Sequence, residues 1–104
     1  MKRRFVLFGL LAASLLFASS TPLTGCRCKG IPLYGRVRVV DHHADFLVRV
    51  VEHHADLHVK KVSSHPDRCG LWQFVDSHPD FTVRFVDSHE DFSIRLVDHH
   101  PGRP

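Results

Sequence analysis

The segment Val75–His100, VDSHPDFTVRFVDSHEDFSIRLVDHH, repeats after eleven residues and starts a third copy after eleven more. The repeating unit can be written V-[DES]-[HS]-H-x-D-[FL]-x-[VI]-[RK]-x, and its starts are Val40, Val51, Val62, Val75, Val86 and Val97. The spacing is eleven residues except for thirteen between Val62 and Val75. Self-similarity at a fixed period indicates a repeat architecture, so the unit decides the fold.

Each unit divides into a strand and a turn. Phe81, Val83 and Phe85 alternate with residues such as Arg84, and FSIRLV (92–97) alternates in the same way. Alternation with a period of two, rich in β-branched and aromatic residues, predicts strands with a buried apolar face. The outer face carries Arg49, Lys60, Arg84 and Arg95. The intervening DSHP, DSHE and EHHA segments are rich in turn-forming residues.

We therefore expect an all-β fold. With four-residue loops between antiparallel strands, the odd period places Phe85 opposite Phe92 and Val83 opposite Ile94, so apolar residues share one face. YGRVRVV, before Asp41, predicts one further strand. The sequence thus favours an antiparallel meander of six or seven short strands that curls into a barrel or half-barrel, or dimerises. The alternative is a parallel β-solenoid with two repeats per coil.

The N-terminus has the pattern of an export signal. Lys2, Arg3 and Arg4 precede the apolar run Phe5–Ala18, which is too short to span a membrane. The following LTGC (23–26) resembles a bacterial lipobox. We predict a lipoprotein signal peptide over residues 1–25, lipidation of Cys26, a tether over 26–35 and a β-repeat domain over 36–104. Ordinary secretion, with cleavage after Ser20, is the alternative.

The two cysteines other than Cys26 indicate a disulfide. In an oxidising compartment Cys28 and Cys69 are expected to form a disulfide, worth roughly 4 kcal/mol in the chain-entropy model. A Cys–His metal site is the alternative, although CRC (26–28) lacks the usual C-x-x-C spacing.

Three of the fourteen Lys and Arg residues lie in the leader, which leaves eleven to balance the eleven Asp and Glu residues. A neutral domain gives no reason to expect nucleic-acid binding.

The repeat resembles a family of small bacterial envelope proteins built from tandem V-D-x-x-S-Q-A-D-[LF]-x-V units. The resemblance covers the A-D pairs at 44–45 and 55–56, GLWQFVD (70–76) and nearly all of the chain after the leader. It implies an all-β envelope domain, and it supplies no activity or ligand. Histidine stands here in place of the family's glutamine. Both side chains offer a hydrogen-bond donor and acceptor, which favours a role within the turn.

A metal site is the competing interpretation of these histidines, because imidazole binds zinc, copper and nickel. The candidate ligands are His43, His54, His65, His78, His89 and His100. In a meander, alternate turns lie at the same end of the sheet. His43, His65 and His89 would then gather at one end and the other three at the opposite end.

Catalysis is not expected, because six equivalent copies do not form one unique site. The sequence therefore predicts a lipid-anchored structural or interaction module of the bacterial envelope, without a cofactor. We expect it at the outer membrane, facing the periplasm or the surface, held by its anchor and available to a protein partner or to self-association. Divalent metal binding is the second hypothesis. A pH-responsive surface protein is the third, since histidines titrate near neutral pH.

Overall fold

The computed structural model describes residue 23 and residues 25–104, and within them it contains eight strands and no helix. The strands are β1 (Arg27–Cys28), β2 (Ile31–Pro32), β3 (Gly35–Val39), β4 (Phe46–Val50), β5 (Leu57–Lys61), β6 (Leu71–Phe74), β7 (Phe81–Phe85) and β8 (Phe92–Leu96). The predicted signal peptide lies outside the described residues apart from Leu23 and Gly25. No helix in the described part is long and apolar enough to cross a bilayer.

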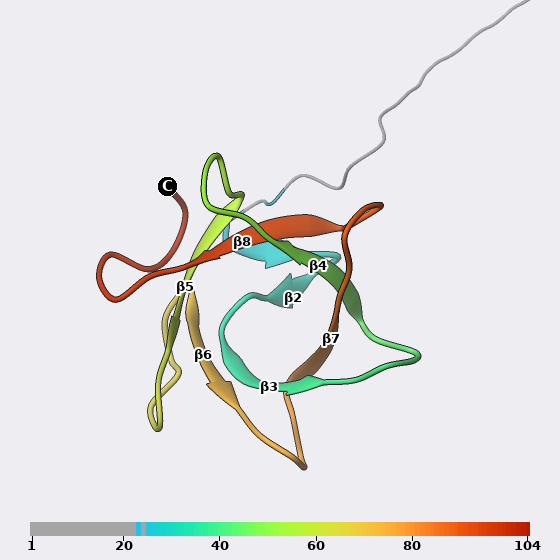
Figure 1. The fold of residues 1–104 in the computed structure, drawn as a ribbon. Helices are drawn as coiled ribbons and strands as arrows, with labels where there is room; N and C mark the ends of the chain where they lie inside the picture. The colour runs from blue at the N-terminus through green and yellow to red at the C-terminus, as the bar shows by residue number, and fades with distance from the viewer. Residues whose placement is uncertain (1–22, 24) are drawn as a thin grey trace, which may run out of the picture.

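Six strands close into a barrel in the order β3-β6-β5-β8-β4-β7, and every pairing between them is parallel. Successive strands along the chain are mostly not neighbours. The chain makes one circuit through β3, β4 and β5, and then a second circuit in which β7 lies between β3 and β4 and β8 lies between β4 and β5. β6 closes the ring between β5 and β3. Figure 1 shows this ring of strands with the connecting loops outside it.

The all-β fold and the curled, barrel-like sheet are confirmed, but the antiparallel meander is wrong. Phe85 does not pair with Phe92; instead Val37 pairs with Phe81, and Phe46 pairs with Val83. The alternative, a β-solenoid, is not observed either, although the barrel strands do pair in parallel, as they would in a solenoid. The meander prediction assumed that a short connection must join neighbouring antiparallel strands.

The connections explain how parallel strands arise without helices. Six residues separate β3 from β4, and six separate β7 from β8. A five-residue strand is roughly 17 Å long. Six extended residues reach about 20 Å. One loop can therefore return along the outside of the barrel and pass the intervening strand, but with little slack. Strands much longer than five residues would not allow this path.

Large side chains fill the barrel in a close aromatic cluster. Trp72 is fully buried, and its ring meets those of Phe81 and Phe92 edge-on at centroid distances of 5.5 and 6.5 Å. Phe46 meets the same two phenylalanines at 5.5 and 5.4 Å. A second inward layer of mainly β-branched residues is formed by Val37, Val48, Val59, Val83 and Ile94, all fully buried. This edge-to-face geometry suits aromatic rings, and the burial is the main stabilising term.

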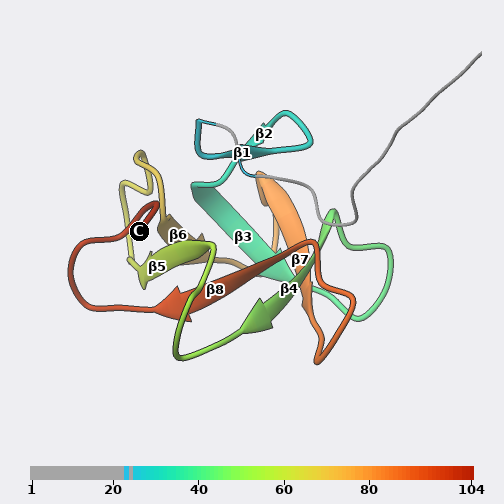
Figure 2. The same ribbon diagram turned by 90° about the horizontal axis from the view of Figure 1, so that it is seen from above.

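The segment predicted as a tether, residues 26–35, instead caps the barrel. β1 and β2 form an antiparallel hairpin, and Figure 2 shows it on one side of the ring. Leu33 is fully buried, and its carbonyl accepts hydrogen bonds from the Trp72 indole N–H at 3.1 Å and from the Gly70 N–H at 3.1 Å. Lys29 lies 5.8 Å from the centre of the Phe46 ring. The hairpin therefore covers the end of the barrel at which the strands begin.

Candidate functional site

The repeated histidine occupies a left-handed backbone conformation in every turn. The φ angles lie between 54° and 61° at His43, His54, His65, His78, His89 and His100. Most residues with a side chain avoid this region, but histidine is found there more often than most. All six side chains are exposed. The histidine is thus the residue at which each loop reverses direction, which agrees with the turn interpretation.

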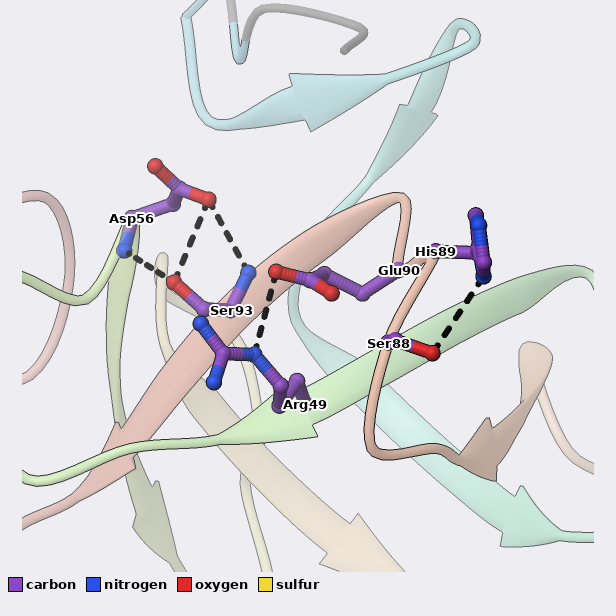
Figure 3. Close-up of polar contacts among 6 residues, drawn as sticks. All are labelled: Arg49, Asp56, Ser88, His89, Glu90 and Ser93. Atoms are coloured by element: carbon purple, nitrogen blue, oxygen red, sulfur yellow. Dashed lines mark hydrogen bonds and ion pairs between the residues drawn. The ribbon is translucent and has the colours of Figure 1, made fainter.

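The loops hold some of these histidines through a neighbouring hydroxyl. Nδ1 of His65 lies 3.2 Å from Oγ of Ser64, and Nδ1 of His89 lies 3.2 Å from Oγ of Ser88. The second pair is drawn in Figure 3. These contacts tie the imidazole to its own loop. Glutamine, which stands at this position in the repeat that the sequence resembles, could make the same kind of hydrogen bond, because its side chain also offers a donor and an acceptor.

The predicted histidine clusters do not form. Among residues 23 and 25–104, no three His, Cys, Asp or Glu side chains are arranged to hold a metal ion. The reason is topological. In an antiparallel meander alternate turns converge at one end, whereas here each loop runs along a different part of the outer wall. His43 and His89 follow the neighbouring strands β3 and β7, but their loops lead on to different strands, β4 and β8, and His65 follows β5, which is not a neighbour of either.

The aspartate of the repeat has a defined structural role that the sequence interpretation missed. Asp45 and Asp56 each accept from a hydroxyl residue on a neighbouring strand: Asp56 Oδ2 accepts from the N–H of Ser93 at 2.9 Å and contacts its Oγ at 3.3 Å. The Asp56 N–H in turn donates to the Ser93 Oγ at 3.1 Å (Figure 3). Each aspartate therefore fastens a loop of one circuit to a strand of the other.

Asp80 and Asp91 make the reciprocal connection. Asp80 Oδ2 accepts from the Arg36 N–H at 2.8 Å, and Asp91 Oδ2 accepts from the Leu47 N–H at 2.8 Å. In the last unit Gly102 replaces the aspartate, and its backbone exchanges two 2.8 Å hydrogen bonds with His58. The recurrence of this aspartate in five of the six units was the available signal, because such residues can satisfy strand donors that would otherwise be unpaired.

The disulfide joins Cys26 to Cys69, 43 residues apart, and Cys28 is free. The expected Cys28–Cys69 pairing is therefore wrong, although a disulfide at Cys69 is confirmed. Cys28 is buried within the hairpin. Burial, and next the nearby Asp91 carboxylate, raise the pKa of the Cys28 thiol, against a smaller lowering by Lys29. A thiol that stays protonated is a poor nucleophile, so Cys28 behaves as a core residue.

The opposite end of the barrel is open and apolar. Because the six strands are parallel, their last residues share one edge, which we call the rim: Val39, Val50, Lys61, Phe74, Phe85 and Leu96. The five apolar members are between 36% and 49% exposed, whereas Phe81 and Val83, on the same face, are at most 2% exposed. The expectation that Phe85 and Leu96 are buried is wrong. Alternation identifies the inner face but does not reveal where the barrel ends.

Three shallow hollows lie along the rim. They are lined by Arg38, Val39, Phe74, Val75 and Asp76; by Val50, Val51, Glu52, Arg95 and Leu96; and by Val59, Lys60, Lys61, Leu96, Val97 and Asp98. Each hollow brings together residues from two neighbouring strands, with one or two basic residues of one strand and an acidic residue that follows the other. The first two hollows each contain two apolar rim residues, Val39 with Phe74 and Val50 with Leu96, whereas the third contains Leu96 and Lys61. The rim therefore combines an apolar centre with alternating charges.

Comparison with protein-family models matches residues 30–104 to the 7(1) septoil knot domain. The match covers the β-repeat domain and begins within the capping hairpin. A knotted path is consistent with the two interleaved circuits, because the second circuit has to pass between strands already placed by the first. The search of curated proteins finds no match for the sequence.

Proposed function

The chain belongs to the septoil knot domain family, and we propose that it serves in the bacterial envelope as an interaction module whose binding face is the rim. One observation carries the proposal. Five of the six rim residues are large, apolar and substantially exposed at the uncovered end of the barrel. Contiguous exposed apolar groups bordered by charged residues are typical of surfaces that contact another macromolecule.

The barrel itself does not require this surface. Lys61 occupies the same strand position in β5 as the apolar residues in the other five strands, and it is exposed. A charged side chain is therefore compatible with the end of the barrel. Apolar residues at the other five positions are 36% to 49% exposed, so each leaves a large part of its side chain in water. A partner that removes them from water would gain the corresponding burial free energy.

The state of Cys26 bears on how the domain is held in the envelope. Its Sγ cannot carry a lipid thioether while it is bonded to Cys69, so lipidation and the observed disulfide exclude one another. The disulfide supports export to an oxidising compartment. We infer that the disulfide-bonded form is released by ordinary secretion. Lipidation of Cys26 would require a form of the protein in which the Cys26–Cys69 bond is absent.

In-cell photo-crosslinking tests the role of the rim. A photoreactive phenylalanine analogue is placed at Phe85, which is 43% exposed on the rim, or at Tyr34, which is 37% exposed near the capped end. We expect discrete crosslinked species from position 85 and not from position 34. Equal labelling at both positions, or no adduct from position 85, would reject the rim as the binding face.

A further inference from the structure

We propose that the partner seated on the rim is a second copy of this chain, so that two barrels meet end to end through their open mouths. This inference rests on the rim being a binding face. It concerns which macromolecule covers that face, and it follows from the distribution of charge around the apolar centre and from the position of the rim relative to the N-terminal hairpin.

The charges on the rim alternate in sign. Arg38 shares a hollow with Asp76, and Arg95 shares one with Glu52. In the third hollow, Lys60 and Lys61 lie with Asp98. A face of one sign suits an anionic bilayer or a nucleic acid, and a mixed face does not, because each acidic residue would oppose binding. The alternation therefore favours a partner whose charges also alternate.

A second copy supplies that pattern without any further assumption. In a two-fold symmetric contact the same surface meets itself, so it must be complementary to itself. On this rim, apolar residues occupy the centre and can meet apolar residues. Rotation of one barrel relative to the other can bring basic groups of one rim over acidic groups of the other. Two identical faces that carried charges of one sign only would repel each other.

The hairpin leaves only one end of the barrel available for this contact. β1 and β2 cover the end where the strands begin, and the disulfide fixes Cys26 of that hairpin to Cys69. The rim is formed by the last residues of the six strands and lies at the end opposite the hairpin, which Figure 2 shows on one side of the ring. The rim is therefore the end of the barrel that remains accessible to another copy.

Sedimentation equilibrium of the purified oxidised protein tests the proposal. We expect a monomer–dimer equilibrium in the wild type. Phe85→Asp and Leu96→Asp should each raise the dimer dissociation constant at least tenfold, because each substitution acts twice in a symmetric contact. Tyr34→Asp, at the capped end, should leave the constant unchanged. An intact Cys26–Cys69 bond and a native Trp72 emission spectrum establish that each variant is folded.

Charge-reversal variants provide a second test of dimerisation that leaves the apolar rim residues unchanged. Arg95→Glu should weaken the dimer, and the double variant with Glu52→Arg should restore most of the affinity because alternation is re-established. A wild-type protein that remains monomeric at all concentrations would overturn the second-copy proposal. If it is monomeric while position 85 crosslinks to a different protein in cells, the rim remains a binding face for another partner. If neither association is found, both proposals fail.

Discussion

At the scale of single residues, the repeat is defined by two side chains with different tasks. The histidine accepts a strained backbone conformation at the point where each loop turns, and the aspartate satisfies donors of a strand from the other circuit. The histidine recurs in all six units, and the aspartate makes these bonds in four of them, at positions 45, 56, 80 and 91. The turn role therefore accounts for the recurrence of the histidine in the repeat.

Adjacent histidines provide a direct test of the left-handed turn. His43 has a φ of 57°, while His42, also exposed, is not among the residues with positive φ. We expect His43→Val to destabilise the protein by about 1–2 kcal/mol, because a β-branched residue is strongly disfavoured there. His42→Val should be nearly neutral, and His43→Gly should be tolerated. Chemical denaturation gives the comparison, and equal effects at 42 and 43 would contradict the turn role.

The aspartate fastening should be measurable at Asp56. Asp56→Ala removes the acceptor for the Ser93 N–H and should cost about 1–3 kcal/mol, since that donor is part-buried. Asp67 is a matched control in the same repeat position, because its carboxylate makes no hydrogen bond within residues 25–104, and its N–H donates within its own loop to the His65 carbonyl. Asp67→Ala should cost clearly less. If the two variants unfold at the same denaturant concentration, the inter-circuit hydrogen bonds contribute little.

At the scale of strands and hairpins, the sequence predicted much of the local structure. The residues of β7 and β8 and the inward positions of Phe81, Val83, Phe92 and Ile94 follow from alternation alone. Strand pairing could not be obtained in this way. Alternation does not determine which strand lies next to which, or whether two neighbours run parallel or antiparallel. Only the path of the loop that joins two strands decides between these arrangements. Cys26 was assigned to lipid from its local motif, so its bond to the distant Cys69 was missed.

The disulfide connects the capping hairpin to the barrel, and its removal should loosen that cap. Cys69→Ser should lower the free energy of unfolding by about 3–4 kcal/mol in the chain-entropy model. Peptide mapping of the oxidised protein should recover a peptide linking Cys26 with Cys69 and leave Cys28 as the only free thiol. Recovery of any other linkage would contradict the observed disulfide.

At the scale of the whole molecule, neither half of the chain is a structural unit. β3, β4 and β5 of the first circuit are not hydrogen-bonded to one another, and each gains its neighbours from the second circuit. The hydrophobic core is shared in the same way, since Phe46 packs against Phe81 and Phe92. Cooperative unfolding of the entire barrel follows from this arrangement, because separating the circuits exposes both.

Native-state hydrogen exchange can test this cooperativity. We expect amides of all six barrel strands to exchange with closely similar opening free energies and the same response to low concentrations of denaturant. The loops should exchange faster, as their amides are less protected. A lower-energy opening confined to residues 35–61, with residues 71–96 still protected, would show that the first circuit can separate from the second.

The interleaving also bears on how such a sequence can change through evolution. In a stacked array each unit touches only its neighbours along the chain, so copies can be gained or lost at the ends. Here the unit containing β4 is flanked by the units containing β7 and β8, and closure needs three strands in each circuit. Loss of one eleven-residue copy would leave a gap in the ring and displace every later strand. The geometry of the closed barrel therefore constrains the number of repeats, and we expect that this fold does not tolerate the gain or loss of a single copy.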